Sequence, residues 1–498
     1  MEVQKNKEYI VEIIDNGFEG EGIAKIDGMT VFIPNAIKGE TIKILVVKVN
    51  KNFAYGKILE IINPSSMRVV ADCQTYKVCG GCNLRHIKYE DTLKIKKAIV
   101  ENCLYKELKR DVSVKDVIGM SEPKYYRNKL IYPVGINKNN ETIMGVFASR
   151  THNIVEVKEC FIQDKLNQEI AAEVLKIIKK YDIKPYNEST GNGSIRHIIV
   201  RCGKQTNEIM IILVCNDKNQ YNVKEKNFNN LKNDELAKNS ANEIAEASII
   251  TTQIMENEMN SNTEIKAFEK ELITILPKKY PQIKSIVKNI NNKNTNVIMG
   301  EKNINLFGEG YITDKLGDYV FKISPNSFYQ VNPVQTVKLY NTAITLANLD
   351  KNDTVLDLYC GIGTISIFLA RHVKKVIGVE IVEAAIEDAK ENAKLNSIDN
   401  VNFYAGDVEL LLPKILKDKE NIPDVLFVDP PRKGLDRNTI ENIKKIKPKR
   451  VVYISCNPAT FARDIALLED TYELGEVQPV DMFCGTSHVE CVCVLKLK

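Results

Sequence analysis

The chain has 498 residues, of which 44% are hydrophobic and 27% are charged, so it is a globular protein with room for two to four domains of roughly 150 residues each and is not a single small module. We find no run of about eighteen apolar residues and no signal sequence, and we therefore expect a cytoplasmic protein without membrane contact. The formal charge of +4 is small for this length, so nucleic acid could be bound only through local basic patches.

Residues 1–62 alternate apolar and polar positions in short runs separated by glycines, a pattern that predicts a small antiparallel β-barrel. This region carries eight lysines against nine acidic residues, so any nucleic-acid contact would have to use one face of the barrel. The candidate residues for that face are Lys43, Lys48, Lys51 and Lys57.

Four of the twelve cysteines have the spacing of a metal site. Cys73, Cys79 and Cys82 lie close together in the sequence, and Cys160 follows at a distance. Three neighbouring thiols and one distant partner suit a four-thiolate centre, either a [4Fe-4S] cluster or a structural zinc. Zinc ribbons usually present two Cys-x-x-Cys pairs, whereas one such pair is present here, so the spacing slightly favours the cluster.

The middle of the chain is predicted to be mostly β, after a helix over residues 91–110. The strand patterns lie around residues 125–129 and at 195–200, 209–215, 283–289 and 296–299. Residues 216–264 differ from their surroundings because they are rich in Asn, Lys, Glu and Ser and contain neither Gly nor Pro. We expect an insertion there that is disordered or weakly helical, since it has too little apolar surface to offset its ordering entropy.

The last part of the chain shows a β-α-β pattern. A strand at residues 354–358 runs into Gly361-x-Gly363, and Glu380 ends the following strand. A glycine turn lets the backbone approach a ligand closely, and an acid at that position can bind both ribose hydroxyls. The pattern predicts a nucleoside cofactor, and a nicotinamide cofactor would fit it as well.

Two further strands, at residues 425–428 and 451–454, end abruptly in polar residues. Because ligands bind at the carboxyl ends of strands in open α/β sheets, Asp429 and Cys456 are expected in one crevice. A cysteine there is a candidate nucleophile, and a neighbouring helix start can lower its pKa. Glu490 lies in an apolar stretch that would raise its carboxyl pKa toward that of a useful base, whereas His488 is more typical of an ordinary histidine.

These motifs resemble those of a known family. The run from Asp429-Pro-Pro-Arg to Ser455-Cys456-Asn-x-x-Thr resembles the signature of the RNA uracil-5-methyltransferases. The stretch 481–490 resembles their second signature, although Cys484 stands where the family usually has proline and Gly485 where it often has Gln or His. Residues 324–332 resemble its Ser-x-x-Ser-Phe-x-Gln-x-Asn block, and Asp-x-x-Cys-Gly-x-Gly at 357–363 resembles motif I of S-adenosylmethionine-dependent methyltransferases.

The resemblance implies an α/β fold in three parts. It implies a TRAM domain, an OB-like RNA-binding barrel, at residues 1–62, and a mostly β central domain with an iron-sulfur site at 63–325. Residues 326–498 would then form a Rossmann-like class I methyltransferase domain. The four cysteines match the family's [4Fe-4S] ligands one by one, so the resemblance implies a [4Fe-4S] cluster on Cys73, Cys79, Cys82 and Cys160.

The resemblance also implies the reaction and its residues. The expected function is transfer of a methyl group from S-adenosylmethionine to C5 of a flipped uridine in RNA. The expected RNA is 23S ribosomal RNA, and the enzyme is expected to be a monomer. Catalysis would fall to Cys456 as nucleophile and Glu490 as base. The cofactor-binding residues would be Gln330, Tyr359, Thr364, Glu380, Asp407 and Asp429. The alternatives are a tRNA uracil-5-methyltransferase, a base-amino methyltransferase and a non-catalytic RNA-binding iron-sulfur protein.

Overall fold

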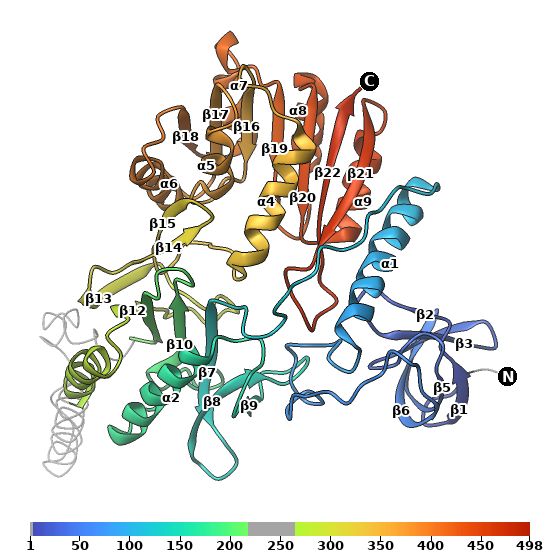
Figure 1. The fold of residues 1–498 in the computed structure, drawn as a ribbon. Helices are drawn as coiled ribbons and strands as arrows, with labels where there is room; N and C mark the ends of the chain where they lie inside the picture. Colours follow the sequence, from blue (N-terminus) through green and yellow to red (C-terminus); the bar gives the residue numbers. More distant parts are fainter. Residues whose placement is uncertain (1–2, 218–263) are drawn as a thin grey trace, which may run out of the picture.

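The computed structural model describes residues 3–217 and 264–498. Within these residues it contains three large sheets, which lie at separate places along the ribbon (Figure 1). The first belongs to the N-terminal barrel, the second lies in the middle of the chain, and the third contains the C-terminal strands. No helix of the described part is long and apolar enough to cross a membrane.

The N-terminal sheet has the strand order β1-β5-β6-β4-β3-β2. Alternate residues point inward and form one apolar core, which explains the period of two seen in the sequence. Only the pairing of β4 with β6 is parallel. The strands are β1 Glu8–Glu12, β2 Asp15–Asn16, β3 Gly22–Ile26, β4 Met29–Ile33, β5 Thr41–Val49 and β6 Phe53–Asn63.

The middle sheet has the order β13-β12-β11-β10-β7-β8-β9, and helix α2 (Lys165–Lys180) packs on one of its faces. The strands are β7 Lys129–Ile136, β8 Thr142–Phe147, β9 Ile154–Glu156, β10 Ile195–Cys202, β11 Ile209–Cys215, β12 Ile283–Ile290 and β13 Lys302–Gly308. The strand predicted at 296–299 is wrong, because this stretch is a turn whose carbonyls are bound by the Asn291 side chain. The predicted insertion falls almost wholly outside the described residues.

A short hairpin, β14 (Ile312–Leu316) and β15 (Tyr319–Ile323), leads into the C-terminal sheet. That sheet has the order β18-β17-β16-β19-β20-β22-β21. Its first five members are parallel, whereas β22 is antiparallel to β20 and to β21. The strands are β16 Thr354–Leu358, β17 Lys375–Glu380, β18 Val401–Ala405, β19 Val425–Val428, β20 Arg450–Ser455, β21 Tyr472–Val480 and β22 Glu490–Leu497.

Helices cover both faces of the C-terminal sheet. One face packs against α4 and α5, and the other against α7, α8 and α9. Helix α1 (Tyr89–Leu108) precedes the middle sheet in the chain, yet it packs against α9 and completes the second face (Figure 1). The C-terminal helices are α4 Pro333–Ala347, α5 Thr364–Ala370, α6 Glu383–Leu395, α7 Val408–Ile415, α8 Arg437–Ile446 and α9 Pro458–Leu468.

Candidate active site

A cavity of about 650 Å³ opens at the carboxyl ends of the parallel strands. All eight residues predicted to be catalytic or cofactor-binding line it. They are Gln330, Tyr359, Thr364, Glu380, Asp407, Asp429, Cys456 and Glu490. His488, which the sequence predicted to be an ordinary histidine, lines the same cavity. The structure therefore brings together side chains that are up to 160 positions apart in the sequence.

The sheet places the reactive groups directly. Asp429 follows β19 and Cys456 follows β20, so both lie at the same edge. Strand β22 runs in the opposite direction, and its first residue is therefore at that edge too. Ser455 pairs with Cys491, a register that sets Cys456 opposite Glu490. A nucleophile and a candidate base thus face the same space.

The two acidic groups at this edge lie close to one another in a buried place. Burial raises the pKa of Asp429 and raises the pKa of Glu490 well above its usual value, and the negative charge of Asp429 raises the pKa of Glu490 further. The Arg432 guanidinium opposes this effect and lowers the pKa of Glu490. The predicted rise in the Glu490 pKa agrees with this direction. Two carboxylates held so close do not both ionise readily, so the pair retains a proton more easily than separate groups would.

Cys456 precedes α9, and a neighbouring helix start can lower the pKa of a thiol. The direction is the opposite. Burial raises the pKa of the Cys456 thiol to about 11, with the charges of Glu490 and Asp429 adding to the effect and Arg432 opposing it. The first helical position is Pro458, and the Asn457 side chain caps the helix by accepting from Ala459. Cys456 is therefore a protonated thiol in the free protein at neutral pH.

The other half of the cavity has the shape of a nucleoside site. The Glu380 carboxylate accepts hydrogen bonds from the backbone of Gly361 (3.2 Å) and Val382 (3.0 Å). Gly361 has φ +55°, and a Cβ atom there would meet nothing within 4 Å, so this backbone faces open space. Tyr359 also has a positive φ of 66°, which is rare for a bulky side chain and typical of functional sites. The residues present fit an adenosine-type cofactor.

Three polar residues complete this half. The Thr364 hydroxyl lies 3.0 Å from the buried Tyr340 hydroxyl, and Asp407 caps α7 by accepting from Glu409. Asp357 precedes the glycine turn in the sequence and is buried without lining the cavity; burial raises its pKa to about 7 against the hydrogen bond from Ser366 (2.5 Å). Its second carboxyl oxygen is buried without a hydrogen-bond partner among the described residues. This set of acids favours a cationic ligand.

Comparison with known proteins agrees with this geometry. The family model described as tRNA (Uracil-5-)-methyltransferase matches residues 270–498, and the TRAM domain model matches residues 2–59. A protein of Oceanobacillus iheyensis named as an uncharacterized RNA methyltransferase is 44% identical over 499 residues, which cover 100% of this chain and 98% of the relative. The chain belongs to the RNA uracil-5-methyltransferase family. The predicted family is confirmed.

Two further similar proteins match over almost the whole chain. A relative from Clostridium acetobutylicum, also named as an uncharacterized RNA methyltransferase, is 42% identical, and the match covers 99% of this chain and 98% of the relative. The solved structure of Pyrococcus abyssi tRNA (uracil-54, C5)-methyltransferase with S-adenosyl-L-homocysteine matches with a TM-score of 0.70 and 26% identity, over 98% of this chain and 100% of that one. The predicted α/β fold, with an N-terminal TRAM barrel and a C-terminal methyltransferase fold, is confirmed.

Sequence reasoning gave no role to three residues that line the methyltransferase cavity. Arg432 is the cation beside Cys456 and Glu490, Tyr340 is buried beside Thr364, and Phe328 is 71% exposed at the wall. A signal for Phe328 was available, since it stands two positions before Gln330 in an extended stretch and alternate residues of an extended chain share a side. Tyr340 gave no such signal, because a buried helical tyrosine resembles ordinary core.

The four predicted metal-ligating cysteines line a second, smaller cavity of about 230 Å³, and all four are free thiols. Burial and the neighbouring thiols together raise the pKa of Cys79 and of Cys82, which reaches about 12. Across residues 3–217 and 264–498, no group of three His, Cys, Asp or Glu side chains lies close enough together to form a metal site as it stands. The thiols thus surround one space without forming a closed ligand set.

The thiol cavity nevertheless fits an iron-sulfur cluster in its chemistry. Arg127 lines the cavity, and its Nε atom is buried with no hydrogen-bond partner in the described part of the chain. Sulfur atoms of a cluster accept hydrogen bonds, which such a donor could supply. Gly81 leaves room beside Cys79, because a Cβ atom there would lie 3.3 Å from the Cys79 sulfur. Four thiols, with the buried Nε donor of Arg127 beside them, suit an anionic cluster.

The TRAM barrel carries an outward-facing aromatic cluster that the sequence analysis missed. Phe32, Phe53 and Tyr55 lie with ring centroids 5.6 to 6.0 Å apart, and the residues between them point into the barrel core. Arg150, from the loop after β8, lies over the Tyr55 ring at 5.7 Å. Lys48 pairs across the sheet with Tyr55. Aromatic residues at outward positions of alternating strands were the signal that could have found this face.

The lysines predicted for a binding face are not equivalent in the structure. Lys43 forms an ion pair with Glu8 at 2.7 Å, which offsets its charge. Lys48, on β5, is exposed beside Tyr55 of β6. Lys57 lies two residues after Tyr55 on β6, and Lys51 lies in the turn between the two strands. The aromatic cluster and Lys48 together therefore provide a stronger candidate for RNA contact than the lysines alone.

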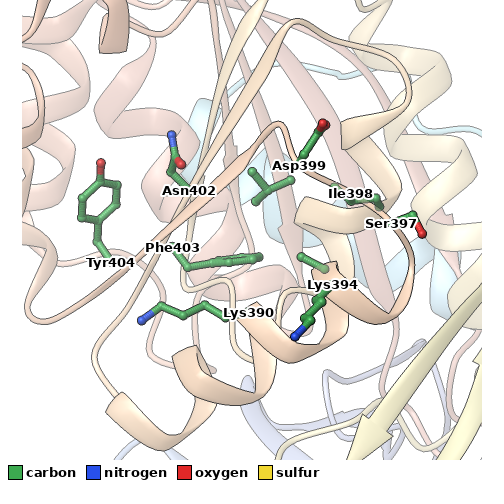
Figure 2. A pocket seen from close by; sticks show the side chains of 10 residues that line it. Lys390, Lys394, Ser397, Ile398, Asp399, Asn402, Phe403 and Tyr404 are labelled. Carbon is green, nitrogen blue, oxygen red and sulfur yellow. The ribbon is translucent and has the colours of Figure 1, made fainter.

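Another hollow, of about 690 Å³, lies between α6 and β18 at the edge of the methyltransferase sheet. Figure 2 shows Lys390 and Lys394 on the helix, with Phe403 and Tyr404 on the strand. Its lining contains none of the predicted site residues, and Lys390 is paired with Glu387 at 2.8 Å. Size alone therefore does not identify the site, because the chemistry lies in the cavity at the strand ends.

The raised thiol pKa predicts how Cys456 reacts in the free protein. Because the pKa of Cys456 is raised to about 11, the thiolate fraction at neutral pH is small and grows about tenfold per pH unit. Alkylation of Cys456 by iodoacetamide, followed by mass spectrometry, should accelerate about tenfold per unit from pH 7 to 9.5. The Cys456→Ala variant is the control for peptide assignment. A rate that levels off below pH 9 would contradict the raised pKa.

Proposed function

We propose that this protein transfers a methyl group from S-adenosylmethionine to C5 of a uridine in RNA, through a covalent bond between Cys456 and C6. The observation that carries the proposal is that Cys456, Asp429 and Glu490 line one cavity together with the nucleoside half around Glu380. A non-catalytic RNA-binding protein would not need a nucleophile and a buried base facing each other. A base-amino methyltransferase would have no use for the thiol.

The first half of the reaction creates a carbon nucleophile. Sγ of Cys456 loses its proton to solvent and adds to C6 of uracil, and the electrons of the C5–C6 double bond move toward C5 and O4. S-adenosylmethionine, when bound, would supply the electrophilic methyl group to C5 and leave as the neutral thioether. Asp429 and Gln330 are assigned to hold the base and the charged end of the cofactor in register. The uridine must leave its stack to reach the thiol.

The second half restores the ring. Glu490 removes the proton from C5, the electrons of that bond form the C5–C6 double bond again, and the bond from C6 to Sγ of Cys456 breaks. The burial that raises the pKa of Glu490 makes it a stronger base than an exposed carboxylate once it is ionised. The acids around the cavity favour a ligand with positive charge, which the sulfonium of the methyl donor carries.

Ribosomal RNA of the large subunit is our proposed substrate, because the family resemblance includes a TRAM domain and the four-cysteine pattern. A tRNA substrate is the second candidate, since a solved structure that matches over 98% of this chain is named as a tRNA (uracil-54, C5)-methyltransferase. Mass mapping of 5-methyluridine in ribosomal RNA and tRNA from a deletion strain separates the two. Loss of the modification from tRNA alone would overturn the ribosomal assignment.

The two catalytic residues should fail in different ways. Cys456→Ala should bind RNA yet neither methylate it nor cross-link to it, because no adduct can form. Glu490→Gln keeps the nucleophile but lacks the base, so methylated RNA should remain on the thiol as a slowly migrating band on a denaturing gel. Removal of a positioned base typically costs about a hundredfold to ten-thousandfold in rate, so the band should persist.

The wild-type enzyme with RNA containing 5-fluorouridine is the matched control for the trapped band, because fluorine cannot leave as a proton. Equal turnover by Cys456→Ala and the wild type would exclude the covalent mechanism. Turnover by Glu490→Gln without any adduct would move the base to another residue, and His488 would be tested first because it lines the same cavity.

We also propose a [4Fe-4S] cluster on Cys73, Cys79, Cys82 and Cys160. Protein purified without oxygen should be brown and contain about four iron and four sulfide ions per chain. Replacement of any one of the four cysteines by serine should remove the colour, whereas Cys103→Ser should retain it, because Cys103 does not line the thiol cavity. Stoichiometric zinc without iron or sulfide would contradict the cluster.

Residues 1–62 are proposed to bind RNA, with the aromatic cluster as the contact. Phe32→Ala with Tyr55→Ala should weaken RNA binding about tenfold or more, since stacking on an aromatic ring is worth about 1–3 kcal/mol per base. Filter binding at several salt concentrations measures this, and Lys43→Ala is the control because its charge is already paired with Glu8. Binding of S-adenosylmethionine should not change, and unchanged RNA affinity in the double variant would exclude this face.

A further inference from the structure

The loop between β21 and β22, residues 481–489, carries part of the active site. It presents Phe483 and His488 to the cavity and ends at Glu490. In Figure 1 this red loop extends away from its sheet toward the blue segment that precedes and begins α1. Several elements bind the loop, among them Asn332 and Gln335 at the start of α4, which donate to the Met482 (3.1 Å) and Asp481 (2.9 Å) carbonyls. A larger set of bonds comes from the segment 82–96, which begins at Cys82 of the thiol cavity.

Asn83 makes the most direct connection. Its side-chain nitrogen donates to the Ser487 hydroxyl (3.1 Å), and its side-chain oxygen accepts from the Ser487 backbone (2.8 Å). The Gly485 carbonyl accepts from the backbone of both Asn83 and Leu84, each at 3.0 Å. The side-chain nitrogen of Asn83 also donates to the backbone carbonyl of Glu19 in the barrel. Four hydrogen bonds therefore fasten the loop at Gly485 and Ser487, five and three residues before Glu490.

A buried ion pair fastens the start of the same loop. Nζ of Lys96 donates to the Asp481 carboxylate (2.6 Å) and to the Phe483 carbonyl (3.1 Å), and the side chains of Lys96 and Asp481 are both fully buried. The Tyr89 hydroxyl donates to the same carboxylate at 2.9 Å. Both ends of the loop are thus tied to one segment, and loss of either partner of a buried pair leaves a costly unpaired charge.

The thiol cavity touches this connection. Gly485 has φ +81°, and a Cβ atom there would lie 3.4 Å from the Cys82 sulfur. Cys484 packs with Cys82 and Cys160, and the Tyr126 hydroxyl donates to the Cys484 carbonyl at 3.1 Å. Cys484 and Gly485 are the two positions at which the stretch 481–490 departs from the usual family signature, and both lie against the segment 82–96. Cys82 therefore lines the thiol cavity and also contacts the loop 481–489.

The sheet register brings Glu490 opposite Cys456. We infer that Asn83, together with Lys96 at the start of the loop, is a positioning residue that holds the loop 481–489 leading into Glu490, so that the Glu490 carboxylate stays aimed at the adduct on Cys456. The inference rests on the proposed function and adds a role for the segment that carries Cys82. Cys456 and Asp429 are placed by β20 and β19, which this segment does not hold. Loosening the loop therefore slows the removal of the C5 proton and leaves the earlier methyl transfer almost unchanged.

The test compares the two halves of one turnover. Asn83→Ala is mixed with RNA from a deletion strain grown on uridine labelled with tritium at C5, and methyl incorporation and tritium release are followed in the same reaction. Methyl incorporation should stay within about twofold of the wild type, whereas tritium release should slow about tenfold to a hundredfold, as expected for a misplaced catalytic group. A covalent protein–RNA band should accumulate in parallel.

Two variants provide the controls. Asn139→Ala changes an exposed asparagine in the turn between β7 and β8 and should keep both rates. Ser487→Ala removes the acceptor of one Asn83 bond from the other side, so it should show the same split in a smaller degree. If Asn83→Ala does not fold, as judged by its thermal unfolding, Ser487→Ala alone decides the outcome.

Equal slowing of both rates, or slowing of neither, would overturn the positioning role. Glu490→Gln is measured alongside to separate this failure from a failure of the proposed function. If Glu490→Gln accumulates the adduct and Asn83→Ala does not, the positioning role is wrong and the mechanism stands. If Glu490→Gln accumulates none, the assignment of the base is wrong.

Discussion

The antiparallel placement of β22 beside β20 is the constraint on which the site depends. Five parallel strands bring their carboxyl ends to one edge, which supplies Asp429 and Cys456. A sixth parallel strand would have placed Glu490 at the far edge of the sheet. Because β22 runs the other way, its first residue meets the last residues of β20, and the register of Ser455 with Cys491 sets the base opposite the thiol.

Burial of these groups then determines their chemistry. The same removal from water raises the pKa of Cys456, Asp429 and Glu490, and the like charges of the two carboxylates strengthen the effect. A thiol with a raised pKa is inert until a reaction partner arrives, which suits a nucleophile that must not react in the free protein. Arg432 is the cation that moderates this arrangement, since it lowers the pKa of both Cys456 and Glu490.

The N-terminal half of the chain also contributes to the methyltransferase fold. Helix α1 packs against α9 and completes a face of the C-terminal sheet. Its Lys96 forms the fully buried pair with Asp481. A buried pair of this kind adds little net stability but specifies one arrangement of the elements that carry it. The barrel, the segment 82–96 and the loop 481–489 therefore meet around Asn83 and do not form independent modules.

Local pattern determined much of this protein. Period-two alternation of apolar and polar residues located most strands. The polar residues that follow the strands ending at 428 and 455 identified Asp429 and Cys456. Both signals could be read from the sequence because the periodicity of a strand and the place where it ends depend on residues close together in the chain. The stretch at 296–299 shows the limit, since a strand-like run became a turn once the Asn291 side chain bound its carbonyls. Three features were decided only by the tertiary structure. They are the rise of the Cys456 pKa, the position of Arg432 in the cavity wall and the hydrogen bonds from Asn83 and Lys96 to the loop 481–489. These depend on burial and on contacts between segments 385 and 404 residues apart in the sequence, which no local pattern encodes.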